Sequence, residues 1–258
     1  MLETISAETA NPVKKKSSTS ETGHAKNIAN FQNLISFCQG YGSAYDPSKE
    51  ALKISALQSQ YVNAIQKLNQ TKATKVSFDN ATNDRRHEFE NLKPLATKII
   101  NAFIVSGADN LAIKDLKSIN KKIQGSNTPK TKTTPEGDAE TVKAISTSQQ
   151  SYDRLIDHYI NLTQVLQQNP FYSPNESELK LSSLNAKILT MQSTNTALIN
   201  SYTQYSNTII QRNQALYDAV TGLTQTAKEV KQYVKSVFGA ASPQYHQVVI
   251  LEFKTMRD

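Results

Sequence analysis

The chain contains no tryptophan and a single cysteine, Cys38, among its 258 residues. One thiol excludes an intramolecular disulfide framework, and it cannot form a cysteine-based zinc site by itself. Apolar residues make up 38% of the chain and aromatic residues 7%, which is less than compact globular domains usually have. This composition favours long, thin helical packing over a thick round core. We expect Cys38 to be a small buried apolar residue.

Long hydrophobic runs are also absent. No stretch reaches the roughly 18 successive apolar residues that a membrane-spanning helix requires. The N-terminal stretch has no apolar run after a basic region, so a secretory signal is not expected. These absences predict a soluble, cytoplasmic protein, with export by a signal-independent route left open.

Glycine and proline are scarce, with eight of each, and they mark the ends of predicted helices. Apolar residues recur at alternating steps of three and four over residues 48–105 and 175–238. This coiled-coil-like spacing predicts two long helices, each with one apolar seam. Gly222 is the only glycine expected inside a helix, and Pro94 is expected to kink the first long helix.

The first long helix is expected to begin with Asp46 as its N-cap and Pro47 in its first turn. Its polar middle, Thr71–Arg86, allows two interpretations. A hairpin turn would divide the helix, but the apolar phase resumes unshifted at Phe89 and no glycine or proline intervenes. We therefore predict a continuous helix through this stretch.

The predicted fold class is all-α: an elongated antiparallel helical bundle with two long helices and shorter flanking helices. Residues 1–23 form a polar tail that we expect to be disordered, and residues 124–138 form a flexible linker rich in proline, glycine and threonine. Residues 24–123 and 139–258 are two helical repeats, which we expect to pack as one rod-like domain.

The two halves match at an offset of 127 residues. Tyr45-x-Pro47-x4-Leu52 corresponds to Tyr172-x-Pro174-x4-Leu179, and Arg85 corresponds to Arg212. Two copies of such a unit could cover each other's apolar seam, which one copy cannot do alone. The pattern therefore predicts that the two long helices arose by an internal duplication.

Several runs carry a resemblance to known proteins: HAKNIANFQNLISFCQGYGSAYDPSKEALKISAL, SINKKIQG and VKSVFGAASPQY. Together with the repeat, they resemble a family of tandem-repeat helical proteins of bacteria that has no assigned function. The likeness covers nearly the whole chain after residue 23. It implies an all-helical repeat fold and transfers no activity, cofactor or site residue.

The matched arginines are the most distinctive polar feature. A guanidinium inside a bundle must find carboxylates, amides or water, and Asp84, Glu88 and Asn195 are candidate partners for a polar layer with Arg85 and Arg212. Such a layer could hold an anion or a small ligand. The alternative is that it only sets the register of the helices.

Lysines crowd a second region, where Lys114, Lys117, Lys121 and Lys122 are interrupted by one acid, Asp115. This patch could meet an anionic partner, or it could simply be a solvated helix face. Nucleic acid is an improbable partner beyond nonspecific contact, because the region has no interleaved aromatic residues and arginine is scarce.

Residues for catalysis or metal binding are not grouped. The four histidines fall on four different predicted elements, and a lone Asp84-x-x-His87 is far short of a di-iron site. No histidine is marked as a base for Cys38, and Gly40-Tyr41-Gly42 is too short for a phosphate loop. We expect no metal, no cofactor and no enzymatic activity.

The predicted function is that of a non-enzymatic structural or interaction protein, which binds a protein partner or associates with itself. One alternative is a ligand-binding bundle that uses the Arg85 and Arg212 layer. Another is a helical protein similar to pore-forming toxins, although the apolar stretches Ala102–Val105 and Val248–Leu251 are too short to insert in a membrane.

Overall fold

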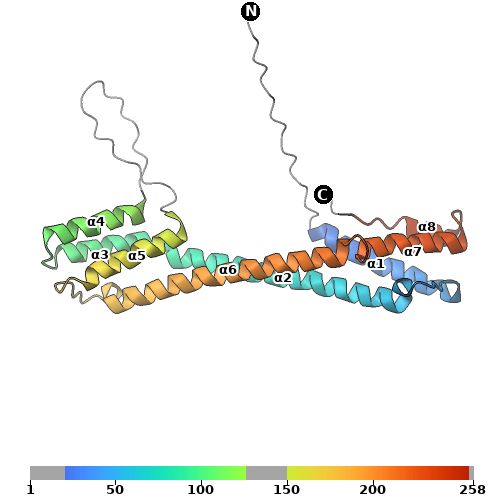
Figure 1. Cartoon of the computed structure of the whole chain (residues 1–258), viewed down its shortest axis with the longest axis horizontal. Helices are drawn as coiled ribbons and strands as arrows, with labels where there is room; N and C mark the ends of the chain where they lie inside the picture. Colours follow the sequence, from blue (N-terminus) through green and yellow to red (C-terminus); the bar gives the residue numbers. More distant parts are fainter. Residues whose placement is uncertain (1–20, 126–149, 256–258) are drawn as a thin grey trace, which may run out of the picture. The chain divides into compact units, whose positions relative to one another are not determined.

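A computed structural model describes residues 21–125 and 150–255. All regular secondary structure in these two ranges is helical, which confirms the all-α class (Figure 1). The helices are α1 (Glu21–Gly40), α2 (Ile54–Glu90), α3 (Leu92–Ile104), α4 (Asn110–Gln124), α5 (Tyr152–Gln167), α6 (Leu181–Tyr217), α7 (Leu223–Phe238) and α8 (Pro243–Val249). Short 3-10 turns, η1 (Gly42–Ala44), η2 (Glu50–Leu52) and η4 (Ser177–Leu179), lie between them.

The described chain divides into two compact units, each with its own hydrophobic core. Unit 1 consists of residues 21–73 and 206–255, and unit 2 of residues 74–125 and 150–205. Each unit therefore takes chain from both predicted repeats, which differs from the predicted domain boundaries. The reason is that α2 and α6 are longer than one core, so each contributes one part to unit 1 and the other part to unit 2.

In unit 1, α1 packs with α7 and α8 against the first part of α2 and the last part of α6. The buried residues of α1 recur at helical spacing, so they form one face toward this core. They are Ile28, Phe31, Leu34, Ile35 and Cys38. Cys38 is 1% exposed, which confirms the prediction that it is a buried core residue.

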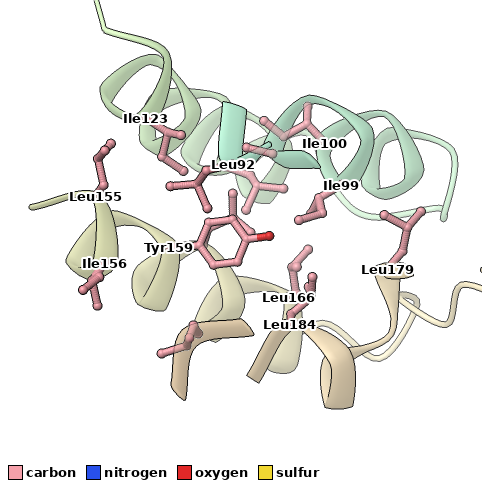
Figure 2. Packing of buried hydrophobic residues seen from close by; sticks show 14 of the residues in the cluster. Leu92, Ile99, Ile100, Ile123, Leu155, Ile156, Tyr159, Leu166, Leu179 and Leu184 are labelled. Atoms are coloured by element: carbon pink, nitrogen blue, oxygen red, sulfur yellow. The ribbon is translucent and has the colours of Figure 1, made fainter. Parts of the chain in front are cut away.

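In unit 2, α3, α4 and α5 lie side by side and pack on the remaining parts of α2 and α6 (Figure 1). Figure 2 shows the ring of Tyr159 on α5 surrounded by aliphatic side chains of α3, α5 and α6. Tyr159 and its neighbours Leu92, Leu162 and Leu184 are almost completely buried. Filling this centre with branched side chains excludes water, which is the main stabilising contribution to such a unit.

One piece of local geometry occurs in both units. The Tyr45 hydroxyl donates to the carbonyl oxygen of Leu52 at 2.8 Å, and the Tyr172 hydroxyl donates to that of Leu179, also at 2.8 Å. In each case the carbonyl belongs to the last residue of a 3-10 turn, and a helix of 37 residues follows. These matches keep the 127-residue offset seen in the sequence, while the internal duplication and the elongated bundle stay predictions.

The first long helix differs at both ends from the prediction. Asp46 and Pro47 lie in the irregular segment before η2, and α2 begins only at Ile54. The helix also ends at Glu90 and does not continue through Pro94. Pro94 has no N–H to donate to the carbonyl four residues earlier, at Glu90, so a break at Asn91 replaces the predicted kink. Continuity through Thr71–Arg86 is confirmed.

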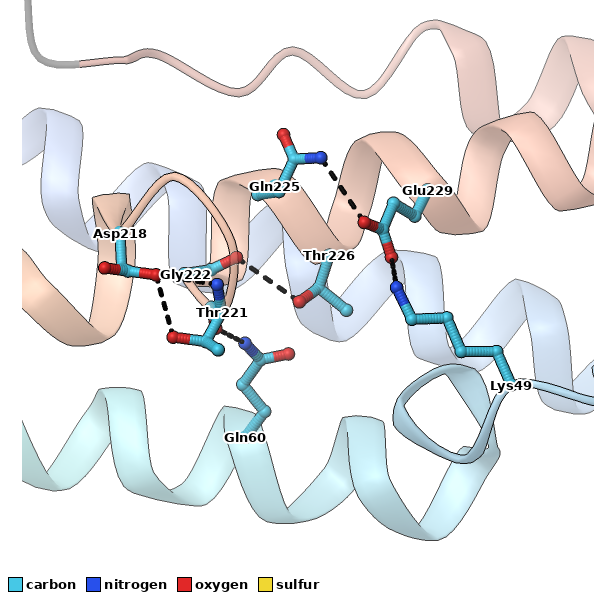
Figure 3. Close-up of polar contacts among 8 residues, drawn as sticks. All are labelled: Lys49, Gln60, Asp218, Thr221, Gly222, Gln225, Thr226 and Glu229. Carbon is cyan, nitrogen blue, oxygen red and sulfur yellow. Dashed lines mark hydrogen bonds and ion pairs between the residues drawn. The ribbon is translucent and has the colours of Figure 1, made fainter.

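The prediction of one helix over 175–238 is wrong, because α6 ends at Tyr217 and α7 begins at Leu223. The turn between them is organised by Asp218 (Figure 3). One carboxylate oxygen accepts from the backbone N–H groups of Thr221 at 2.7 Å and Val220 at 3.0 Å, and from the Thr221 hydroxyl at 2.9 Å. These bonds lower the pKa of Asp218, and the bond from the Thr221 N–H contributes most. Gly222, expected inside a helix, is the N-cap of α7.

Other boundaries shift less. The first helix begins at Glu21, so residues 21–23 belong to α1 and not to the predicted tail. Residues 1–20 and most of the predicted 124–138 linker lie outside the described residues, as does the first part of the repeat expected from residue 139. The last helix begins as its sequence suggests, with Ser242 capping the Tyr245 N–H at 3.1 Å and proline in the first turn.

Candidate functional site

The structure places the two predicted arginines in different units, Arg85 in unit 2 and Arg212 in unit 1. Each guanidinium has partners within its own unit. Arg212 is 5% exposed, and its Nε and Nη2 atoms donate to Oδ1 of Asn213 at 3.1 and 3.0 Å. A layer that contains both arginines stays a prediction.

Arg85 belongs to a small cluster that includes residues of α5 and α6. Its Nη1 donates to Oδ1 of Asn195 at 2.9 Å, and Nδ2 of Asn195 donates to Oδ1 of Asp153 at 2.7 Å. The guanidinium carbon lies 4.0 Å from the centroid of the Tyr152 ring, a cation–π contact. Asn195 thus joins a cation to a carboxylate through one amide.

The two acids predicted beside Arg85 have other environments. Asp84 is exposed to solvent, and the Glu88 carboxylate forms an ion pair with Lys187 at 2.8 Å. Lys187 also donates to the Glu88 carbonyl oxygen at 2.7 Å. Sequence reasoning missed Asp153, because its link to Asn195 spans 42 residues and no spacing rule marks it.

The lysine patch lies on the outward face of α4. Lys114, Lys117 and Lys121 recur at steps of three and four, so they share one face, with Lys122 beside them, and all four are exposed. The opposite face buries Leu116 and Ile123 in the core of unit 2. Within residues 21–125 and 150–255, no carboxylate forms an ion pair with any of the four ammonium groups.

An open groove of about 540 Å³ lies in unit 2, between the end of α3 and the segment before η4. An ion pair between Lys98 and Glu178, 2.8 Å long, lies at its edge. Phe171 and Val105, 61% and 83% exposed, line it. The groove offers apolar contact area beside this ion pair.

The titratable groups offer little reactive chemistry. Burial raises the pKa of the Cys38 thiol to about 12, so it stays protonated at neutral pH, whereas the thiolate is the nucleophile. Among the described residues, no three histidine, cysteine or carboxylate side chains come together as a metal site would require. The same part of the chain has no helix with the length and apolar character to span a bilayer.

These observations define an all-helical protein of two compact units, with a lysine face on one of them. Comparison of the chain with protein-family models, with curated proteins and with solved structures found no match. The resemblance to bacterial tandem-repeat helical proteins stays a prediction.

Proposed function

We propose that the protein is a non-enzymatic interaction protein, which binds an acidic surface of a partner protein through the outward face of α4. One observation carries this proposal: four exposed lysines cover a helix face and have no ion-pair partner among the described residues. A concentration of uncompensated charge attracts an oppositely charged surface and speeds association.

The rest of α4 suits a role as a rigid support. Asp109 caps the helix by accepting from the N–H groups of Leu111 at 2.8 Å and Ala112 at 3.0 Å. Lys121 and Lys122 lie in the last turn, where the helix dipole favours positive charge. Because Leu116 and Ile123 anchor the opposite face, the lysine stems keep their spacing when a partner approaches.

The composition of this face favours a protein over a nucleic acid. Residues 110–124 contain no aromatic side chain on which a base could stack and no arginine for bidentate phosphate contacts. Lysine makes point-charge contacts, which suit scattered carboxylates.

Charge reversal on this face tests the proposal. The triple variant Lys114→Glu, Lys117→Glu and Lys121→Glu lowers the net charge from +7 to +1. A matched control, Lys26→Glu, Lys72→Glu and Lys228→Glu, changes the charge equally at exposed but scattered positions of unit 1. Fluorescence anisotropy would follow binding of labelled polyglutamate in about 50 mM and about 300 mM salt, where screening differs strongly.

We expect the wild type and the scattered control to bind polyglutamate, and the α4 variant to bind at least about tenfold more weakly at low salt. Equal weakening of both variants would show that net charge matters and the face does not. Tighter binding of a single-stranded oligonucleotide of equal charge would assign the face to nucleic acid.

A second candidate function, anion binding at Arg85, has one observation in its favour. The Arg85 Nε is buried and has no hydrogen-bond acceptor among the described residues, so it has a spare donor. If this donor serves a ligand, native mass spectrometry of the wild type should reveal a bound anion that Arg85→Leu lacks. If the cluster only sets the helix register, Arg85→Leu should keep or raise the unfolding midpoint, with no mass difference beyond the substitution.

A further inference from the structure

The C-terminal segment of unit 1 lies along two helices without forming one of its own. After α8 ends at Val249, residues 251–255 are irregular and run back toward the first turns of α1 (Figure 1). From the Leu251 carbonyl onward, their described backbone hydrogen bonds are made to side chains of α1 and α7, not to other backbone groups. Side-chain amides and an ammonium thus form the hydrogen bonds to the segment's backbone that a neighbouring strand would form in a sheet.

Asn27 is the main contact. Its Nδ2 donates to the carbonyl oxygen of Lys254 at 2.8 Å, and its Oδ1 accepts from the Lys254 N–H at 2.9 Å. The Asn27 side chain is 0% exposed. Without a chain in this place the amide would lose both bonds, which is costly for a buried polar group.

Two further side chains hold the backbone that precedes Phe253. Asn30 donates from Nδ2 to the Glu252 carbonyl at 2.7 Å. Lys231 on α7 donates to the Leu251 carbonyl and, at 3.4 Å, to that of Val249. None of these bonds involves a side chain of the segment, so they recognise any chain in this conformation.

The side chains of the segment alternate between the two sides. Leu251 and Phe253 are partly buried against the core of unit 1, while Glu252 and Lys254 are exposed. The Lys231 ammonium lies 5.2 Å from the centroid of the Phe253 ring. Selectivity for the segment therefore depends on two apolar residues at alternate positions.

We propose that this surface of α1 and α7 is a binding site for an extended peptide of a partner protein, and that the chain's own residues 251–255 occupy it as a competitor. The peptide would carry apolar residues two positions apart, as Leu251 and Phe253 do. Exchange preserves every bond of Asn27, Asn30 and Lys231, because a peptide offers the same backbone groups. The site belongs to unit 1 and is independent of the lysine face on α4.

The test uses the full chain carrying Phe253→Ser, which removes the buried ring without placing a charge beside Lys231 and so weakens the hold of its own segment. The probe is a labelled peptide with the sequence of residues 250–255, ILEFKT. We expect this variant to bind the peptide saturably and the wild type to bind it at least about tenfold more weakly, because its own segment competes. Failure of the folded variant to bind the peptide would overturn the proposal.

A change in the peptide itself checks the binding mode without altering the protein. Replacing the amide before Lys254 by an ester removes the N–H that Asn27 accepts from. The matched control is an ester before Leu251, because the Leu251 N–H bonds only to Val248, which the peptide lacks, and the Ile250 carbonyl accepts no described hydrogen bond. The first ester should weaken binding by about three- to tenfold and the second should not, since one hydrogen bond contributes on that scale. Equal affinity of both esters would contradict the assigned geometry.

Hydrogen exchange of the wild type provides a measurement that needs no variant. The Lys254 amide should exchange more slowly than in a free peptide but much faster than the core amides of α7, because a displaceable segment opens locally. Exchange at the same rate as α7 would make the segment a permanent part of the core and overturn the proposal. A dimer of the wild type that Phe253→Ser abolishes would assign this surface of α1 and α7 to a second copy instead of a partner protein.

Discussion

Gly222 illustrates how a single residue permits a turn. It precedes α7 with φ −68° and ψ 148°, a conformation open to any residue. Space is the constraint, because a Cβ atom built there would lie 2.4 Å from the backbone nitrogen of Asp218 and 2.5 Å from its carbonyl oxygen. The glycine is needed for this close approach and not for its backbone freedom.

We predict that Gly222→Ala destabilises the protein by about 1–3 kcal/mol, because backbone atoms must move to admit the methyl group. Gly40→Ala is the matched control, since no heavy atom lies within 4 Å of its Cβ position. It should be neutral or stabilising by up to about 1 kcal/mol. Denaturant unfolding measures both, and equal effects would show that the turn at Asp218 relaxes freely.

Cys38 links burial to pH dependence. Burial raises the pKa of its thiol from 9.0 to about 12, so between these values the folded state holds a proton that the unfolded state releases. Its contribution to stability is therefore complete below pH 9 and declines as the pH rises toward 12. Burial likewise raises the pKa of Tyr41 and of Tyr172 from 10.0 to about 12, and these groups add to the loss above pH 10.

We expect the free energy of unfolding to fall as the pH rises from 9 to 11, when measured by denaturant titration. In Cys38→Ala the decline just above pH 9 should be shallower, because one of the groups responsible is gone. The comparison uses the slope with pH, since the substitution also lowers stability at every pH by leaving a small cavity. Identical slopes for the wild type and Cys38→Ala would show that the thiol has the same pKa in the folded and the unfolded state.

At the scale of elements, the start of each 37-residue helix is held by a tyrosine. The hydroxyls of Tyr45 and Tyr172 bind the last carbonyl of the preceding 3-10 turn, and both side chains are 6% exposed. In unit 1 this turn is also tied to α7 by a 2.6 Å ion pair between Lys49 and Glu229 (Figure 3). In both units, therefore, the turn before the long helix is fixed by contacts from outside that helix.

We predict that Tyr45→Phe and Tyr172→Phe each cost about 1–2 kcal/mol, because a buried carbonyl loses its donor. Tyr61→Phe is the control, since its hydroxyl bonds to Gln32 Oε1 at 2.8 Å in an exposed position, and it should change stability by less than about 0.5 kcal/mol. Thermal or denaturant unfolding of the three variants is the measurement. A large effect of only one of the two buried hydroxyls would argue against equivalent roles.

At the scale of the whole molecule, two separate cores replace a single one. Leu34 of α1 is fully buried in unit 1, and Leu162 of α5 is fully buried in unit 2. The low apolar content of the chain is consistent with cores that are small and divided.

Leu34→Ala and Leu162→Ala should each destabilise by about 2–5 kcal/mol through lost contacts and a cavity. Because the cores are separate, we expect faster hydrogen exchange mainly at amides of unit 1 for Leu34→Ala and of unit 2 for Leu162→Ala. Native-state exchange read by mass spectrometry of peptides resolves the two. Equal loss of protection in both units would mean that they unfold as one cooperative body.

The sequence by itself determined the features that depend on local periodicity and on single residue types. Helical spacing predicted the all-α class and the burial of Cys38. It also predicted the continuity of α2 through Thr71–Arg86 and the outward lysines of α4. Each of these follows from 3.6-residue repetition or from residue type, which the local sequence shows directly.

Tertiary structure alone decided the features that depend on distant chain. Periodicity could not reveal the break at Asn91 or the turn at Asp218, because such short interruptions leave the apolar pattern almost intact. It could not join Asn195 to Asp153 or Asn27 to Lys254, which are 42 and 227 residues apart. Such partners meet only because particular helices pack together. That packing minimises the exposed apolar surface of the whole unit, which no local stretch of sequence specifies.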